Sequence, residues 1–483
     1  MSGTNYSRGG VVSDNCAMAM AIQPPALLRA QPLQKRLWQI GGLLAIWTLI
    51  VGGANLVLPA DKAVTPAMLG HDFLPFYMAG TFAREGRVDQ LYDLNIARQW
   101  QQALAAEHGL VLGNTFGPWW NPPHFAWMFA PYSMLPYRLA LAAWTMTGVL
   151  CLAISIVLLV RLLPRREDDR APDWRTWGLV PLLILCSMPF VQAISHGQNT
   201  FLSLLLLSGT VVLWRGNRAI GAGLVCGLLF YKPQLATLVS AVMLLTMGPR
   251  VLIGLGLTGC AIGAVTALTM PTALLTFVQQ VPANLVNFQI DNAYMWERHV
   301  TLAAFWRLLL QGYQTGPATL PVTMLTAASV ALLIMGLLTA IWRQARMDRP
   351  DTPWHLDTRS MRRARLIAAT IIISPLLMPF YFDYDLLLLA VPAVLMARQR
   401  LLVSEDRPAF RLDPCLVVAF GLLVVAMMFN PGMGRATGVN IGVIALMLLG
   451  ALSIRLAVPR RPALITDVQF PVRALPVTLR QAA

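Results

Sequence analysis

Long apolar stretches separated by short polar segments make up most of the chain. A helix needs roughly 20 residues to cross a hydrocarbon core of about 30 Å. By this measure, the sequence predicts membrane spans at 37–59, 137–160, 176–195, 199–214, 250–270, 320–342, 366–381, 384–397, 413–429 and 437–457. The pattern therefore predicts an all-α polytopic membrane protein.

One further apolar stretch, 219–247, is interrupted at its middle by Tyr231, Lys232, Pro233 and Gln234. A lysine at the centre of a single spanning helix would cost about 3 kcal/mol, and Pro233 would break the hydrogen-bond ladder. Two short helices that meet at a turn avoid both costs. This hairpin gives twelve crossings with both termini in the cytoplasm and most of the 37 Lys and Arg residues inside, as the positive-inside rule favours. Its short halves are expected to be re-entrant or to lie in a thinned or protein-lined region.

The sequence predicts a division into two tails and two membrane parts. These are a disordered cytoplasmic tail at 1–35, a transmembrane module at 36–400, C-terminal transmembrane helices at 401–457 and a second cytoplasmic tail at 458–483. The first outer loop, 60–136, is the longest, and 271–319 is the second longest. We expect the chemistry of the protein to lie on this outer side.

Within the first outer loop, residues 89–107 carry a single apolar stripe. The stripe consists of Tyr92, Ile96, Trp100 and Leu104, and the polar residues Gln101, Gln102 and Glu107 lie outside it. This spacing predicts an amphipathic helix that lies in the membrane interface.

Composition and charge narrow the class of protein. With 57% apolar and 12% charged residues, the chain lies outside the range of soluble globular proteins. The net charge of +15 comes from Arg residues between apolar runs, without basic patches interleaved with stacking aromatics, so it indicates membrane topology and no nucleic-acid partner. The six cysteines have no CxxC spacing and predict neither a disulfide framework nor a metal site.

Polar residues that carry candidate chemistry gather on the predicted outer side. The clusters are His71, Asp72, Tyr77 and Tyr92; Asn121 to His124; His196, Gly197, Gln198 and Asn199; Tyr231, Lys232 and Gln234; and Asp383 with Asp385. Three of these clusters have a structural alternative: Asp72 as a helix N-cap, 196–199 as a tight turn, and the last two aspartates as caps of the following helix.

Together these residues supply one carboxylate, one cation and several amide and imidazole groups. This combination suits transfer of a sugar from a lipid phosphate to a hydroxyl group. Asp72 would act as the general base, and Lys232 would hold the phosphate as a point charge. The remaining candidates for substrate contacts are His71, Tyr77, Tyr92, Asn121, His196, Gln198, Asn199, Asp383 and Asp385.

The order and spacing of short motifs in this chain resemble glycosyltransferase family 87. The motifs are Asp72, Phe73, Tyr77, Gly86 and 91–93, then 121–123, Pro131, 135–136 and Trp144, then 197–199 and Lys232. The resemblance covers roughly 60–250 and extends more loosely to about 400. It implies a GT-C fold and a polyprenyl-phosphate-sugar-dependent, mostly mannosyl, transferase that inverts the sugar in a single displacement without a metal or other cofactor. It also implies that Asp72 is the catalytic base and that 89–107 is a juxtamembrane helix.

The resemblance and the residues together predict a multi-pass enzyme of the cell (inner) membrane with a periplasmic active site. Its partners would be membrane lipid, a polyprenyl-phosphate sugar donor carrying a hexose, expected to be mannose, and an envelope glycan or glycolipid acceptor. The main alternative is a twelve-helix secondary transporter or lipid flippase, although such proteins usually have related halves and mid-membrane charges. A third is another GT-C enzyme, such as a polymerase or arabinosyltransferase.

Three further motifs have structural interpretations. Gly254, Gly256 and Gly259 spell GxGxxG, but they lie in an apolar run without a preceding strand, which excludes a nucleotide fingerprint. Gly223 and Gly227 form GxxxG and predict close helix packing. The cluster 297–299 is interpreted either as a salt-bridged loop anchor or as a set of acceptor contacts.

Overall fold

The computed structural model describes most of the predicted membrane region. It covers 70–163 except 111 and 113–115, 177–291 except 186, 294–347, 356–402 and 414–458, together with separate residues within 38–50. The predicted tails at 1–35 and 458–483, apart from residue 458, and most of the predicted span 37–59 lie outside these residues. The described part is helical and contains no strand, only an isolated bridge between His299 and Phe382.

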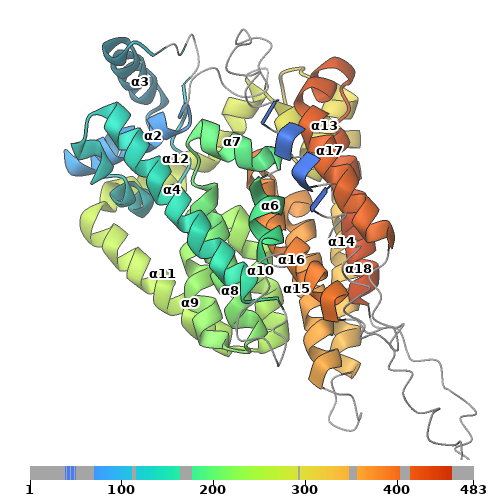
Figure 1. Cartoon of the computed structure of the whole chain (residues 1–483). Helices are drawn as coiled ribbons and strands as arrows, with labels where there is room; N and C mark the ends of the chain where they lie inside the picture. Colours follow the sequence, from blue (N-terminus) through green and yellow to red (C-terminus); the bar gives the residue numbers. More distant parts are fainter. Residues whose placement is uncertain are drawn as a thin grey trace, which may run out of the picture.

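The helices are numbered along the chain as in Figure 1. Those of the first half are α2 (Phe73–Arg84), α3 (Leu94–His108), α4 (Tyr137–Val160), α6 (Leu179–Leu185), α7 (Met188–His196), α8 (Thr200–Arg215), α9 (Ala219–Leu228), α10 (Pro233–Met247) and α11 (Arg250–Thr269). Those of the second half are α12 (Pro271–Ile290), α13 (Leu302–Gln311), α14 (Leu320–Met347), α15 (Leu356–Leu377), α16 (Ala390–Leu402), α17 (Pro414–Thr437) and α18 (Ile441–Ala457). The 3₁₀ helices are η2 (Val88–Gln90), η3 (Pro123–Met128), η4 (Tyr132–Met134), η5 (Leu229–Tyr231), η6 (Trp296–Arg298) and η7 (Asp383–Leu389).

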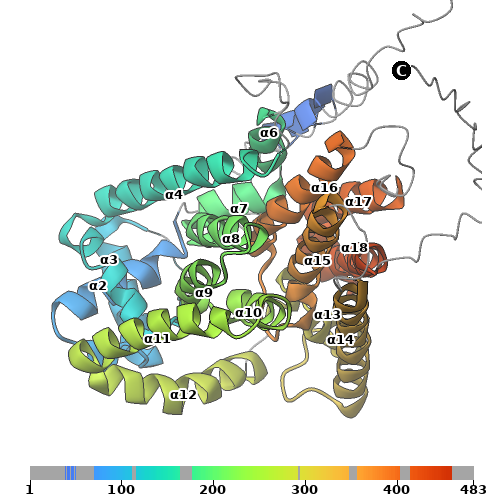
Figure 2. The same cartoon turned by 90° about the horizontal axis from the view of Figure 1, so that it is seen from below.

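The arrangement is that of a multi-pass membrane protein. Four described helices, α4, α11, α14 and α17, are long and apolar enough to cross a membrane, and the bent pair α6 and α7 makes a fifth span if it is counted as one. The exposed faces of these helices carry large apolar side chains, such as Leu150 on α4 and Leu332 on α14. Such faces fit a hydrocarbon solvent. In Figure 2, α8 and α9 lie between α4 and α11, and α10 lies between this group and α14, α15 and α18.

Several predicted spans differ from the structure. The predicted run 176–195 is broken into α6 and α7, which meet at 65°. The run 384–397 is divided between η7 and α16, and every side chain of η7 is buried. The leucines of η7 fill the protein interior and do not face lipid. The runs 199–214 and 437–457 correspond to α8 and α18, which belong to a shorter class of apolar helices of 10–17 residues.

The hairpin predicted at 219–247 is confirmed as two helices, α9 and α10, joined through η5. Cys226 on α9 contacts Ser240 on α10 with 3.3 Å between Sγ and Oγ, as expected when two antiparallel helices meet near residue 232. The positions of Gly223 beside Gly254 and of Gly227 beside Thr258 show that α9 and α11 run parallel. The chain therefore reverses at Lys232 and again before α11.

Glycines set the close approach of α9 to α11. A Cβ on Gly223 would collide with the Val251 carbonyl oxygen, and a Cβ on Gly254 would collide with the Ile220 carbonyl oxygen. Only glycine permits this backbone contact, because any side chain would push the helices apart. The packing role predicted for the GxxxG motif is thus confirmed, and Gly254 of the apparent GxGxxG motif has the same role.

The segment that contains α2 and α3 packs around α2 as a small aromatic core. All residues of α2 except Arg84 are buried, and the Phe76 and Phe129 rings are stacked with centroids 4.8 Å apart. The amphipathic helix predicted at 89–107 is α3, which begins later because Asp93 caps it by accepting from two backbone amides. Gln101, predicted outside the apolar stripe, is buried and exchanges two hydrogen bonds with the Gly117 backbone. A buried amide needs such partners.

Candidate functional site

Asp72 lies in a turn that is attached to the end of α7. The Gly70 amide donates to the Ser195 carbonyl at 2.7 Å, and the Asp72 amide donates to the His196 carbonyl at 3.0 Å. Helix α7 then ends at Gly197, whose φ of 70° favours glycine. These bonds fix the Asp72 backbone relative to the 196–199 turn, although the two segments are far apart in the sequence.

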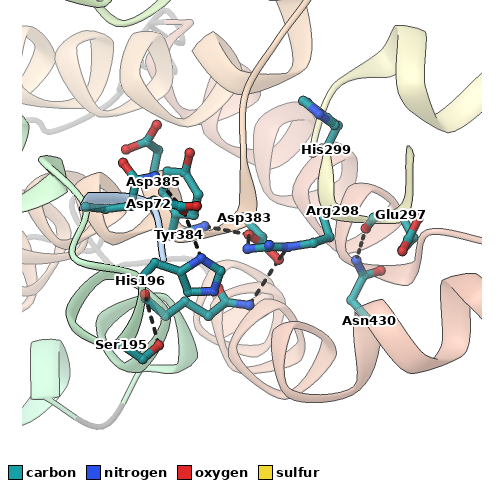
Figure 3. A network of polar contacts seen from close by, with 12 residues as sticks. Asp72, Ser195, His196, Glu297, Arg298, His299, Asp383, Tyr384, Asp385 and Asn430 are labelled. Atoms are coloured by element: carbon teal, nitrogen blue, oxygen red, sulfur yellow. Dashed lines mark hydrogen bonds and ion pairs between the residues drawn. The ribbon is translucent and has the colours of Figure 1, made fainter. Parts of the chain in front are cut away.

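The Asp72 carboxylate is held by three side chains. Its Oδ2 atom accepts from Gln198 Nε2 at 2.7 Å and lies 2.9 Å from His196 Nδ1, while Oδ1 lies 3.3 Å from His71 Nδ1. Asp72 occupies the N-cap position of α2, as the structural alternative predicts, but its side chain makes no capping bond to the helix. Figure 3 shows Asp72 next to the His196 ring.

Electrostatics keep Asp72 ionised. Burial alone would raise the pKa of its carboxyl group, but interaction with His196 and His71 outweighs burial and lowers that pKa well below its ordinary value. The side chain is still 27% exposed. Asp72 is therefore a charged carboxylate that remains partly accessible.

Lys232, at the turn between η5 and α10, is bound by Asp385. Its Nζ atom lies 3.0 Å from each oxygen of the Asp385 carboxylate. Thr200 donates a further hydrogen bond of 2.8 Å to the same carboxylate. The lysine and the aspartate are both buried. Asp385 thus pairs with the cation at the hairpin turn and does not cap the helix that follows.

A second ion pair lies beside the first. Arg298 of η6 donates to Asp383 through Nε at 3.3 Å and through Nη2 at 3.0 Å. Gln192 of α7 donates to the same carboxylate at 3.0 Å. Asp383 is completely buried, whereas the Arg298 side chain is 16% exposed. The 297–299 segment therefore contributes a cation to this region.

Tyr384 joins these groups into one polar cluster, which we define as Asp72, His196, Lys232, Arg298, Asp383, Tyr384 and Asp385. Lys232 Nζ lies 5.3 Å and Arg298 Cζ 6.0 Å from the centre of the Tyr384 ring. The His196 ring centre is also 6.0 Å from it. Figure 3 shows most of these side chains converging from separate parts of the chain.

Three predicted contact residues have structural partners away from the polar cluster. The Tyr77 hydroxyl donates to the Leu135 carbonyl at 2.8 Å. The Tyr92 hydroxyl donates to the Asn121 carbonyl at 2.8 Å. These bonds connect parts of the segment between α2 and α4 to one another. The structure thus brings together Asp72, its three partners and the two ion pairs, but not these residues.

A cavity of about 230 Å³ has Gln198, which binds Asp72, in its lining. Its lining consists of Met128, Pro131, Tyr132, Trp144, Thr147, Gly148, Cys151, Gln198, Asn199, Phe201 and Leu202. The side-chain amide of Asn199 is buried there and has no hydrogen-bond partner among the described residues. Apart from Gln198, Asn199 and Thr147, the lining is mainly apolar and aromatic, as in many sites that bind small amphipathic molecules.

The rest of the 297–299 segment acts as a structural anchor. Glu297 accepts from Tyr313 at 3.1 Å and from Arg435 at 2.9 Å. His299 Nε2 lies 2.9 Å from the Tyr294 hydroxyl, and burial together with the nearby Arg298 lowers the pKa of His299 to about 3. Glu297 and His299 thus anchor the loop, as the first alternative predicts, and they fix the turn that presents Arg298.

Sequence reasoning did not single out Gln192, Thr200 and Tyr384 as site residues. The sequence feature that could have indicated one of them is an uncharged polar residue within an apolar helix. Gln192 is such a residue, one turn before His196. Among the described residues, no three His, Cys, Asp or Glu side chains are grouped as metal ligands would be. The three aspartates of the polar cluster bind imidazole, amide, hydroxyl and cationic groups instead.

The fold and the polar cluster show that this is a helical membrane protein with a mostly buried polar site, in which Asp72 is partly accessible. Comparison with known protein families shows to which family the chain belongs. The model of glycosyltransferase family 87 matches residues 119–360, half of the chain, and the chain belongs to this family. The resemblance found in the sequence is thereby confirmed. No curated protein and no solved structure matches the chain.

Asp72, Asp383 and Asp385 lie outside the matched range, whereas His196, Gln198, Lys232 and Arg298 lie within it. The structure connects the two sets by direct hydrogen bonds and ion pairs. The site is therefore assembled from residues on both sides of the boundaries of the family match.

Proposed function

We propose that this membrane glycosyltransferase takes a hexose, expected to be mannose, from a polyprenyl-phosphate carrier. The acceptor is a hydroxyl group of an envelope glycan or glycolipid. The observation that carries this proposal is the Asp72 carboxylate, which is ionised, hydrogen-bonded by His196 and Gln198, and accessible at one end of a bundle of apolar helices. Family membership favours an enzyme over the transporter or flippase alternative.

Asp72 acts as the general base in a single displacement. The acceptor hydroxyl gives its proton to the Asp72 carboxylate, and its oxygen forms a bond to the anomeric carbon. The bond from that carbon to the phosphate oxygen breaks, and the electron pair leaves with the polyprenyl phosphate. The hydrogen bonds from His196 and Gln198 aim the carboxylate, and proton transfer of this kind is typically worth about 10² to 10⁴ in rate.

The predicted topology supports a lipid-linked donor. The positive-inside rule favours cytoplasmic termini and an outer location for Asp72 and Lys232. A donor that remains in the membrane can reach such a site from the side, between apolar helices. The cavity beside Gln198, with its largely apolar and aromatic lining, agrees with an amphipathic substrate.

The test is a comparison of envelope glycolipids by mass analysis. A host that lacks the protein is complemented with the wild type or with Asp72→Asn. We expect one class of glycolipid to lose a single hexose in the deletion strain, to regain it with the wild type and to remain deficient with Asp72→Asn. Normal glycolipids in the deletion strain, combined with loss of substrate uptake or lipid translocation, would support a transporter or flippase instead.

A further inference from the structure

The lysine that the sequence offers for the donor phosphate is already occupied. Lys232 contacts both carboxylate oxygens of Asp385, and these side chains are only 9% and 3% exposed. A phosphate that bound Lys232 would have to displace a buried carboxylate and leave it unpaired, which is strongly unfavourable. The Lys232 and Asp385 pair therefore holds the hairpin turn of α9 and α10 against η7.

Arg298 has donors to spare. A guanidinium carries five N–H donors, and Arg298 uses one on Nε and one on Nη2 to bind Asp383. Within the described part of the chain, its Nη1 makes no hydrogen bond. Because the arginine side chain is partly exposed and its partner is not, the unused donors lie on the accessible side. A planar guanidinium with free donors suits the geometry of a phosphate.

Helix α7 positions both Arg298 and Asp72 through side chains on two successive turns. Asp383, which fixes the guanidinium, also accepts from Gln192. Gln192 lies one turn before His196 on α7, and His196 is a partner of the Asp72 carboxylate. The guanidinium and the base are thus attached to successive turns of one helix, and Figure 3 shows Arg298 extending toward the cluster that contains Asp72.

We infer that Arg298, and not Lys232, binds the phosphate of the lipid-linked donor, with Asp383 as a positioning residue. This inference rests on the proposed function. As the bond from the anomeric carbon to the phosphate oxygen breaks, negative charge builds up on the phosphate, and the Arg298 donors stabilise it without transferring a proton. The carboxylate base stays on the acceptor side and the cation on the leaving-group side.

The experiment measures binding of farnesyl phosphate and of farnesol to the purified full-length protein in detergent. These two probes share the isoprenoid chain and differ in the phosphate. The wild type is expected to bind farnesyl phosphate more tightly. Arg298→Gln should weaken farnesyl phosphate binding about tenfold or more, as loss of a charge-assisted hydrogen bond does, and leave farnesol binding unchanged.

A matched control uses the same substitution at Arg87, which binds Gln90 and the exposed Glu85 away from the polar cluster. Arg87→Gln should retain the preference for farnesyl phosphate. Should Arg298→Gln fail to fold, Arg298→Lys provides the second test. Arg298→Lys keeps the positive charge, but an ammonium group lacks the planar set of donors that could bind Asp383 and a phosphate at the same time. This variant should lose part of the preference for farnesyl phosphate.

The double variant Lys232→Met with Asp385→Leu removes the other ion pair without leaving one charge unpaired, and it should retain the preference. Loss of the preference in this double variant, with full retention in Arg298→Gln, would overturn the assignment to Arg298 while leaving the proposed function intact. Absence of any preference in the wild type would instead overturn the lipid-phosphate donor itself.

Discussion

Replacing Asp72 by asparagine removes the proposed base with little change in volume. The asparagine carbonyl oxygen can take the place of Oδ2 and accept from Gln198 Nε2 and His196 Nδ1, which approach Oδ2 at 2.7 and 2.9 Å. The amide nitrogen then takes the place of Oδ1, 3.3 Å from His71 Nδ1. Because hydrogen bonds to a charged acceptor are stronger than those to a neutral one, we expect a loss of about 1–3 kcal/mol in stability.

The effect on catalysis should be larger. Loss of a general base lowers the rate about 10² to 10⁴-fold, which corresponds to about 3–5 kcal/mol in activation free energy. The assay is the rate of hexose transfer by purified protein in proteoliposomes, with thermal unfolding measured on the same samples. A folded variant that still transfers hexose within about threefold of the wild-type rate would refute the role of Asp72.

A matched control is Asp93→Asn, which makes the same substitution in the segment between α2 and α3. The Asp93 side chain caps α3 by accepting from the Asn95 and Ile96 amides, and asparagine is an equally good N-cap. The transfer rate of this variant should equal that of the wild type. An equal loss of activity in both variants would point to a general structural effect.

Three other predictions follow from the packing and charge of the described residues. Lys232→Met alone leaves the buried Asp385 carboxylate unpaired and should lower the free energy of unfolding by about 3–5 kcal/mol, measured by chemical denaturation in detergent; a change within 0.5 kcal/mol would contradict the buried pair. Gly254→Ala should lower the melting temperature clearly, because its Cβ would collide with the backbone of α9, whereas the Gly256 control meets no atom within 4 Å and Gly256→Ala should not. The pKa of Asp72 is lowered in the folded protein. Its ionised form therefore contributes its full stabilisation above the ordinary pKa of about 4, and this stabilisation is lost as the pH falls through the lowered pKa. The acid limb of the pH–rate profile due to Asp72 should therefore lie below pH 4, and a midpoint near pH 6 would contradict this assignment.

The membrane class and the main segments could be predicted from the sequence because apolar runs and their interruptions have a direct physical meaning. The α4 span was predicted with its observed bounds, and the break at Lys232 followed from the cost of a central lysine and proline. The run at 384–397 was misleading because a stretch buried in protein and a stretch facing lipid have the same apolar composition.

The candidate site could be predicted only in part. Asp72 and the 196–199 turn could be placed together because both lie at the ends of predicted helices on one side of the membrane. The pairing of Lys232 with Asp385, and of Arg298 with Asp383, could not be predicted because it depends on tertiary packing between segments more than 80 residues apart. Lys232, predicted to bind phosphate, is thus part of a buried ion pair. Arg298, which lies in the segment interpreted as a loop anchor, has a partly exposed guanidinium.

We propose that the hexose comes from a lipid phosphate at the site around Asp72. The most direct measurement compares two donors with the purified protein in proteoliposomes, labelled polyprenyl-phosphate mannose and labelled GDP-mannose, with an envelope lipid extract as acceptor. Label is expected to enter the acceptor from the polyprenyl donor and not from the nucleotide donor. Transfer from GDP-mannose, with none from the polyprenyl donor, would contradict this proposal.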